Sequence, residues 1–203
     1  MKKVYVILAI LVVIGLPVAA VLYVSRNTAP TVYKARDLGI RFTQAEFTAA
    51  QAKLDGILTG KQSTSSFDSR ELTSLLIEES RKGAPVLDPQ IKINKDNTVE
   101  VAGLLAMKRI EALAKSEKSL EEVVFYLGTR HDVPFYAKLK GSIENGHGNM
   151  QILQLNIQDS DIPNSMVAEN QGMILEMLDK EISAAGISSI KSNGGTVTVQ
   201  RVP

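Results

Sequence analysis

The sequence IKINKDNTVEVA, residues 91–102, carries the clearest structural signal in this chain of 203 residues. Ile91 and Ile93 alternate with polar neighbours, and Val99 and Val101 do the same on the other side of a polar turn. Alternation with a period of two is typical of strands that bury one face and expose the other. Residues 91–102 therefore predict an antiparallel β-hairpin.

The same alternation returns twice in the C-terminal half of the chain. Residues 135–143 and 153–157 flank the turn-forming residues 144–149, and residues 187–192 pair with 196–201 across Asn193-Gly194-Gly195. In the first of these strands, the residues expected on the buried face are Phe135, Ala137, Leu139 and Ile143, with Tyr136, Lys138 and Lys140 opposite. Three hairpins predict an antiparallel sheet.

Helical spacing surrounds the hairpins. Helices are expected at 43–58, from Asp68 to about residue 82, at 104–115, at 120–128 and at 164–185. Asp68 with Glu71 three residues later approximates a capping box, and Gly186 supplies the stop of the longest helix. Residues 60–66 are expected to be a polar break. The predicted fold is α+β, with a curved antiparallel sheet of hairpins packed against helices.

The N-terminus contains an uncharged apolar run of 21 residues from Val4 to Val24. A helix of this length spans about 31 Å, which matches the hydrocarbon core of a bilayer. Lys2 and Lys3 precede the run, and only Arg26 lies close behind it. This charge bias predicts a single-pass protein of the cell membrane with a cytoplasmic N-terminus and an extracytoplasmic C-terminal domain.

Two other interpretations of this run remain open. A secretory signal cleaved after Ala20 has the required basic start, apolar stretch and small residues, and it would also export the rest of the chain. A buried core helix is disfavoured by the two lysines and the length of the uncharged run. The expected organisation is an anchor over residues 1–26, a juxtamembrane linker over 27–39, and one α+β domain over 40–203.

Composition excludes several classes of function. Beyond residue 26, the chain carries 20 basic and 22 acidic side chains, a formal charge of −2, which disfavours nucleic-acid binding. The chain has no cysteine, and therefore no disulfide, thiolate metal site or cysteine nucleophile. It also lacks an Asn-x-Ser/Thr glycosylation acceptor. An exported domain without disulfides favours a bacterial cell envelope.

No catalytic or metal-binding pattern is present in the sequence. His131 and His147 have no accompanying ligand spacing and are interpreted as solvated loop residues. The serine-rich residues 63–66 have no nearby base, and Asp159 with Asp161 lack the oxygen spacing of a calcium loop. We therefore expect a protein that is not an enzyme, with no cofactor and no metal.

Two features support binding of an apolar ligand. Met166, Met173 and Met177 share the longest helix, and methionine adapts well to irregular apolar partners, although ordinary core packing explains the same pattern. The apolar faces of the strands at 135–143 and 150–157 suit either a core or a groove. The candidate groove residues are Leu72, Leu76, Phe135, Leu139, Leu155, Met173 and Met177.

Four segments carry a resemblance to a known family: FTQAEF at residues 42–47, FDSRELTSLL at 67–76, VEVAG at 99–103 and LQLNIQDSDIP at 153–163. Together with the N-terminal run, they resemble bacterial single-pass envelope proteins of the YpmS type and, more distantly, tubular lipid-binding (TULIP-like) domains. The resemblance implies a strongly bent sheet wrapped around a helix, sometimes with a lipid in the cleft. It implies no catalytic residues.

The expected function is a membrane-anchored extracytoplasmic domain that binds a lipid or another apolar ligand without catalysis. The alternative is an envelope adaptor that docks another protein and binds no small molecule. An exposed apolar patch would favour the adaptor, and an internal cavity would oppose it. A hydrolase is disfavoured because no nucleophile and base occur together.

Overall fold

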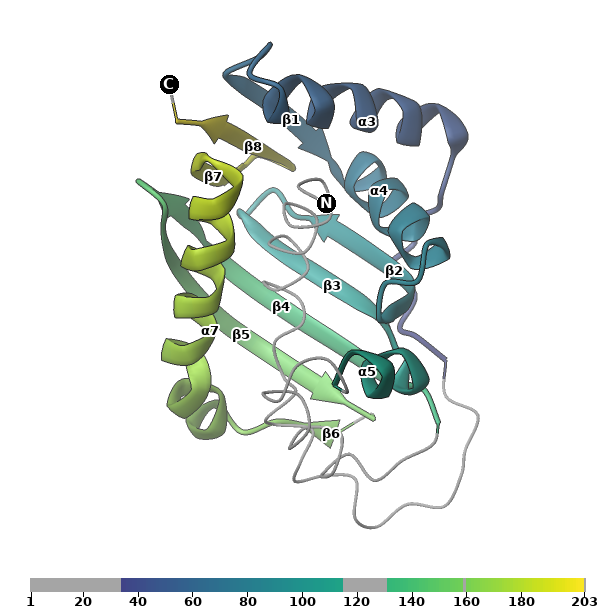
Figure 1. The fold of residues 1–203 in the computed structure, drawn as a ribbon. Coiled ribbons are helices and arrows are strands. Elements are labelled where there is room, and N and C mark those ends of the chain that lie inside the picture. The colour runs from purple at the N-terminus through teal and green to yellow at the C-terminus, as the bar shows by residue number, and fades with distance from the viewer. Residues whose placement is uncertain (1–33, 115–130, 159, 203) are drawn as a thin grey trace.

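The computed structural model describes residues 34–114, 131–158 and 160–202 of the chain (Figure 1). It is α+β, as predicted, with one antiparallel sheet of eight strands. The strands are β1 (Thr64–Asp68), β2 (Val86–Ile93), β3 (Thr98–Leu105), β4 (Val133–Glu144), β5 (His147–Ile157), β6 (Ser160–Asp161), β7 (Ile187–Asn193) and β8 (Thr196–Arg201). The described helices are α3 (Gln44–Leu58), α4 (Ser69–Arg81), α5 (Met107–Ala114) and α7 (Asn164–Ala185).

The longest strand, β4, organises the sheet. One edge of β4 pairs with β5 along most of its length. The other edge pairs first with β3, ending at Lys140 opposite Thr98, and then with β7, beginning at Ser142 opposite Lys191. The sheet therefore forks at Gly141, where the β2–β3 hairpin leaves β4 and the β7–β8 hairpin joins it. Strand β1 pairs with β8 and forms the edge of the sheet beyond the β7–β8 hairpin.

Glycine is required at the fork. Gly141 has φ +155°, and a Cβ at this position would lie 2.2 Å from the carbonyl oxygen of Asn149. The obstructing atoms, which belong to Asn149 and Met150, are backbone on the paired strand β5, so they do not move aside as a flexible side chain would. The close approach of β4 and β5 at the fork thus depends on the absence of a side chain.

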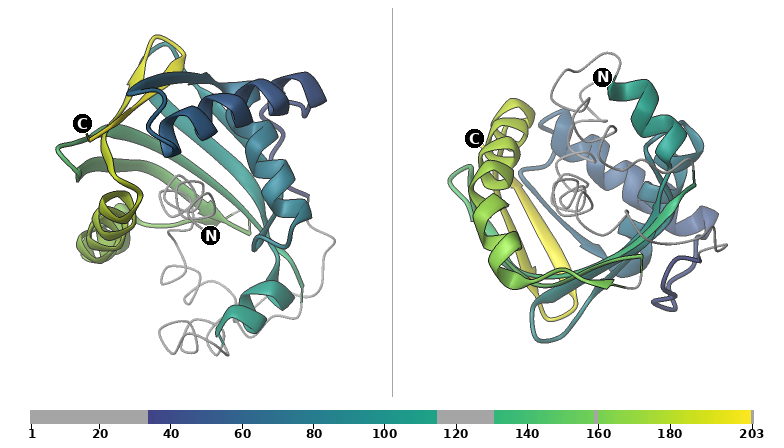
Figure 2. Two further views of the ribbon diagram at one scale, coloured as in Figure 1. Left: turned by 45° about the horizontal axis from the view of Figure 1, so that its top comes forward. Right: turned by 90° about the horizontal axis from the view of Figure 1, so that it is seen from below.

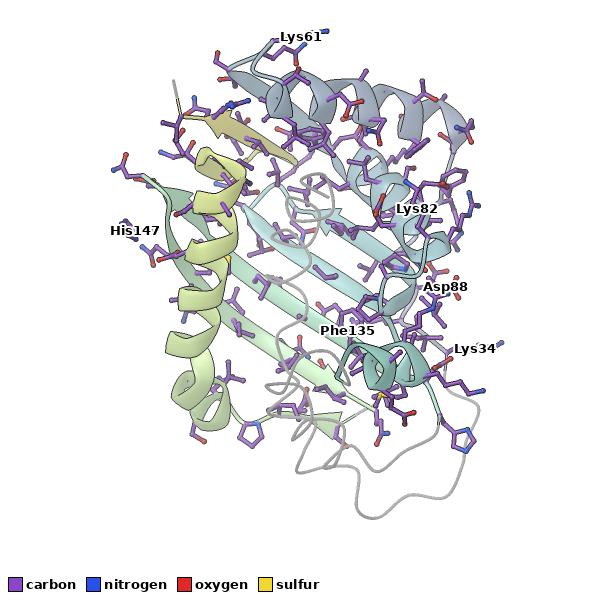
Figure 3. All side chains as sticks on the ribbon, viewed as in Figure 1. Lys34, Lys61, Lys82, Asp88, Phe135 and His147 are labelled. Atoms are coloured by element: carbon purple, nitrogen blue, oxygen red, sulfur yellow. The ribbon has the colours of Figure 1, made fainter. Side chains whose placement is uncertain are left out.

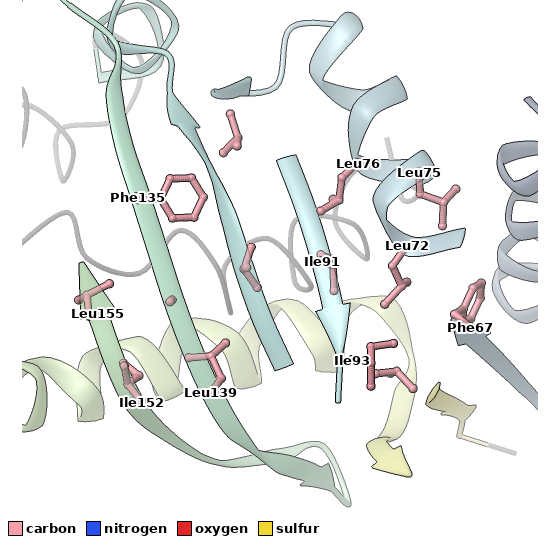
Figure 4. Close-up of a cluster of buried hydrophobic side chains, with 14 of the residues drawn as sticks. Phe67, Leu72, Leu75, Leu76, Ile91, Ile93, Phe135, Leu139, Ile152 and Leu155 are labelled. Carbon is pink, nitrogen blue, oxygen red and sulfur yellow. The ribbon is translucent and has the colours of Figure 1, made fainter. Parts of the chain in front are cut away.

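The sheet is curved (Figure 2), and its two faces differ in polarity. Cross-strand partners such as Val101 and Ala137 place apolar side chains on one face, whereas Glu100 and Lys138 pair on the opposite face. The apolar face carries most of the core, with α4 packed on β2, and α7 packed on β5 and β7. Figure 4 shows Leu72 and Leu76 of α4 beside Ile91 of β2.

Helix α4 also covers the outer edge of β2. The buried Thr73 hydroxyl accepts a hydrogen bond from the backbone N–H of Ile91 (2.9 Å). The hydroxyl of Ser69 accepts one from the N–H of Ile93 (2.9 Å). Two helix side chains thus take the place of a neighbouring strand, which protects an edge that is otherwise open to pairing.

The start of α4 confirms the capping box expected from the sequence. The Asp68 carboxylate accepts hydrogen bonds from the backbone N–H groups of Arg70 and Glu71, and Glu71 accepts one from the N–H of Asp68. Glu71 is buried, and the ammonium group of Lys53 donates to both of its carboxylate oxygens at 2.6 and 2.8 Å. This contact ties α3 to the first turn of α4.

Some expectations for the elements are wrong. The polar break expected at residues 60–66 contains the start of β1, in which Ser65 and Phe67 are buried. The helix expected from Leu104 begins only at Met107, because β3 continues through Leu105. The helix expected at residues 120–128 lies outside the described residues.

The N-terminal prediction also falls mostly outside the structure. The anchor expected at residues 1–26 lies outside the described residues, and none of the helices that are described has the length and apolarity to cross a membrane. The end of the expected linker is described and contacts the domain. The backbone N–H groups of Leu38 and Ile40 both donate to the side-chain oxygen of Gln90 in β2.

Candidate functional site

A cavity of about 90 Å³ lies on the apolar face of the sheet, at the fork. Its walls come from α4 and from strands on both sides of the fork, and almost all of the atoms exposed in it are apolar. The lining residues are Leu72, Ile91, Val99, Val101, Leu139, Lys140, Gly141, Ser142, Ile143, Met150, Ile190 and Val197.

The register of the sheet explains why the cavity forms here. Val99 of β3 lies opposite Leu139 of β4, and Ile190 of β7 lies opposite Ile143 of β4. These two rows of side chains belong to hairpins that separate at Gly141. Because the rows diverge instead of packing against each other, they leave a gap between them, which Leu72 borders from α4.

The cavity offers little to a polar ligand. The lining residues with polar side chains are Lys140 and Ser142, on either side of Gly141, at the point where β4 changes its partner. Lys140 itself is exposed, and the remaining lining side chains are aliphatic or methionine. A site of this kind selects a ligand by shape and burial of carbon atoms rather than by hydrogen bonds.

The structure brings together only some of the predicted groove residues. Leu72 and Leu139 line the cavity. Leu76, Phe135 and Leu155 are buried in the core but are not among its lining residues. The remaining two predictions, Met173 and Met177, belong to α7, and their side chains lie outside what the structure describes.

Most of the lining was missed by reasoning from the sequence. The missed apolar residues are Ile91, Val99, Val101, Ile143, Met150, Ile190 and Val197. Each belongs to an alternating segment that was recognised as a strand, so the local signal was present. What the pattern does not contain is the pairing of β7 with the far end of β4, which brings the last hairpin to the cavity.

On the opposite face, Tyr136 and Glu100 form the main polar contact. The Tyr136 hydroxyl donates to a Glu100 carboxylate oxygen at 3.0 Å. Burial, reinforced by this carboxylate, raises the pKa of Tyr136 to about 12. Burial alone would raise the pKa of Glu100, but the hydrogen bonds from Asn94 and Tyr136 outweigh it, so that this pKa is lowered.

His147 lies at the start of β5, where it contacts α7. His147 is exposed, and its Nδ1 lies 3.2 Å from a carboxylate oxygen of Asp179 in α7. The other oxygen of Asp179 accepts a hydrogen bond from the N–H of Gly148, so this contact ties the start of β5 to α7. Within residues 34–114, 131–158 and 160–202, no group of three or more metal-ligating side chains comes together.

Comparison with known proteins adds no relative: no protein-family model, curated protein or solved structure matches this chain.

Proposed function

We propose that this protein is a non-catalytic domain that binds the apolar end of a lipid or a similar molecule at the fork of its sheet. The cavity is the observation that carries the proposal, because its walls are almost entirely apolar and come from both diverging hairpins. The resemblance of the sequence to YpmS-type envelope proteins and, more distantly, to tubular lipid-binding domains supports the same proposal.

The size of the cavity limits what it accepts as it stands. A cavity of about 150 Å³ is enough for benzene. The present cavity of about 90 Å³ therefore has room for only a few carbon atoms, such as the end of an acyl chain. A longer stretch of chain would extend beyond the cavity, along the apolar face of the sheet.

An anchored position would suit such a ligand. We propose that the apolar run from Val4 to Val24 holds the domain on the extracytoplasmic side of the cell membrane, close to a source of lipid. The adaptor alternative has less support. Among the described residues, Leu153 and Val202 are the exposed large hydrophobic side chains, and they do not form a docking patch of useful size.

The test is native mass spectrometry and lipid extraction on the full chain, purified from a bacterial host in a maltoside detergent. Two substitutions on β3 form a matched pair. Val99→Phe places a larger side chain in the cavity wall, whereas Leu104→Phe enlarges a half-buried side chain that does not line it. We expect a co-purified lipid in the unaltered chain and in Leu104→Phe, and its loss in Val99→Phe.

Two results would contradict the proposal. One is a lipid-free unaltered chain that also gains no thermal stability from added fatty acid or phospholipid. The other is equal lipid occupancy in Val99→Phe and Leu104→Phe, both folded by circular dichroism. Either result would favour the adaptor and direct the search to protein partners.

A further inference from the structure

A second pocket, of about 320 Å³, is lined by Lys34, Arg36, Pro134, Phe135, Tyr136 and Asn156. The side chains of Tyr136 and Asn156 come from neighbouring strands, where the two residues are direct cross-strand partners. They lie on the polar face of the sheet, opposite to the face that carries the apolar cavity. Figure 3 labels Lys34 and Phe135 at the same end of the sheet.

One side of this pocket is cationic. The guanidinium carbon of Arg36 lies 4.0 Å from the centre of the Tyr136 ring. Among the described residues, neither Arg36 nor Lys34 forms an ion pair or donates a hydrogen bond to a protein acceptor. The N–H groups of a stacked guanidinium lie in the plane of that group and point outward, where they can bind two oxygens of a phosphate or carboxylate.

Asn156, in the wall of the pocket, carries an unsatisfied acceptor. The side-chain oxygen of Asn156 is buried and has no hydrogen-bond donor within the described part of the chain. Its amide nitrogen donates to the carboxylate of Asp161, its cross-strand partner, and this contact fixes which way the amide points. A buried acceptor without a donor is unfavourable, and a ligand with an N–H or O–H group would relieve it.

From this combination we infer that the pocket binds a small phosphate compound that also carries an N–H or O–H donor, as in a phosphoethanolamine group. The phosphate binds Arg36 and Lys34, and the donor binds Asn156, with the negative Asp161 behind it. The site is distinct from the apolar cavity and does not depend on the function proposed for it.

Such a group has two possible sources, a free metabolite or the headgroup of a membrane lipid. Lys34 follows the end of the apolar run at Val24 by ten residues. An extended chain of ten residues reaches at most about 36 Å, so an anchored domain would hold this pocket near the headgroup layer. The position of the pocket thus favours the lipid, on the condition that the proposed anchor exists.

The test uses the full chain in maltoside detergent and isothermal titration with three soluble probes: O-phosphoethanolamine, phosphocholine and inorganic phosphate. Phosphocholine has the same phosphate and a positive nitrogen, but that nitrogen carries no N–H donor. We expect phosphoethanolamine to bind about tenfold more tightly than phosphocholine, the effect of one charge-assisted hydrogen bond.

Variants assign the two halves of the pocket. We expect Arg36→Gln to weaken the binding of all three probes about tenfold. The matched control is Lys61→Gln, which removes the same charge from an exposed residue outside the pocket and should change nothing. Asn156→Leu should bring phosphoethanolamine down to the affinity of phosphocholine while leaving inorganic phosphate unchanged.

The inference is overturned if no probe binds, if phosphoethanolamine and phosphocholine bind equally, or if Arg36→Gln and Lys61→Gln behave alike. Since Arg36 is exposed, its variant tests the site even if Asn156→Leu fails to fold. A further titration with dihexanoyl phosphatidylethanolamine, below its micelle concentration, separates the sources. Tighter binding than the free headgroup supports the lipid, and equal or weaker binding overturns the membrane source in favour of a free phosphate compound.

Discussion

Gly141 is the residue at which β4 exchanges one neighbouring hairpin for another. A side chain here would meet the backbone of Asn149 at 2.2 Å and of Met150 at 2.6 Å. Its φ of +155° is also a conformation that residues with a side chain rarely adopt. The fork, and with it the apolar cavity, therefore depends on one glycine.

We predict that Gly141→Ala lowers the free energy of unfolding by more than about 1 kcal/mol, because the steric conflict with β5 adds to the backbone strain. Gly172→Ala is the control. Gly172 is exposed within α7 and has open space around its Cβ position, so alanine should stabilise the helix by about 0.5–1 kcal/mol. Urea unfolding of both variants decides the matter, and similar effects of the two substitutions would contradict the role given to Gly141.

Tyr136 makes the stability of the fold depend on pH in the alkaline range. Its pKa is about 12 in the fold, against an ordinary value of 10.0. The folded state thus holds the phenol proton more tightly, and this contribution to stability is complete below pH 10 and is lost as the pH rises toward 12.

We predict that Tyr136→Phe removes this part of the pH dependence, because phenylalanine has no proton to lose. The same substitution removes a donor from Glu100, whose lowered pKa should then rise toward its usual value. Urea unfolding at pH 9, 10 and 11 measures the first effect, and carboxyl chemical shifts measure the second. An unchanged alkaline slope in Tyr136→Phe would assign the dependence to another group.

At the scale of the element, α4 combines the best-defined helix start with a role in the sheet edge. The Asp68 carboxylate accepts hydrogen bonds from two backbone N–H groups, each at 2.8 Å. Glu71 accepts the reciprocal hydrogen bond from the N–H of Asp68 and forms an ion pair with Lys53. The first turn of α4 is therefore fixed by contacts that also position the helix against α3.

We predict that Asp68→Ala destabilises the domain by about 1 kcal/mol, since two N–H groups lose their acceptor. Asp68→Asn is the control, because asparagine is an equally good N-cap residue and should cost only a small part of this. Thermal unfolding of the two variants is the measurement. A loss of equal size in both would show that the charge of Asp68, and not its capping geometry, is what matters.

The sequence predicts these elements where periodicity is strong and fails where the cause is non-local. The hairpin at residues 91–102 and the faces of β4 follow the alternation. Strand β1 was missed because it is only five residues long, TSSFD, and mostly polar. Leu153 alternates with Leu155 in the sequence yet is exposed, since an irregularity opposite Lys138 and Leu139 shifts the register between them.

At the scale of the whole molecule, the two hairpins that separate at the fork meet again at their tips. The side-chain oxygen of Asn97, in the β2–β3 turn, accepts a hydrogen bond from the N–H of Gly194, in the β7–β8 turn, at 3.0 Å. Asn97 has φ +65°, a left-handed conformation that asparagine tolerates and glycine adopts freely. The two hairpins that border the cavity are thus joined to β4 at the fork and linked by this hydrogen bond at their tips.

We predict that Asn97→Gly leaves the free energy of unfolding within about 1 kcal/mol of its original value, because glycine suits the turn while one hydrogen bond is lost. Amide hydrogen exchange at Gly194 and its neighbours should become faster. Asn145→Gly is a control with the same change at another positive φ, 53°, in the β4–β5 turn. Unchanged exchange at Gly194 would show that the two tips do not depend on this bond.

The residues of the two candidate sites come together through the overall arrangement of the hairpins, and no single segment contains a site. Leu72 and Leu139 were predictable as apolar groove residues from their spacing, but the contribution of Ile190 and Val197 depends on where the last hairpin joins. The stacking of Arg36 on Tyr136 joins residues one hundred positions apart, of which only the tyrosine lies in a recognisable strand.

The pairing of β1 with β8 also determines when the domain can complete its sheet during synthesis. Ser66 and Thr198, whose hydroxyls are 2.9 Å apart, are separated by 132 residues. At about 5–20 residues per second, a ribosome needs roughly 7 to 26 seconds to make the chain between them. During that interval β1 has no strand to pair with, so the nascent domain stays incomplete until its last hairpin is made.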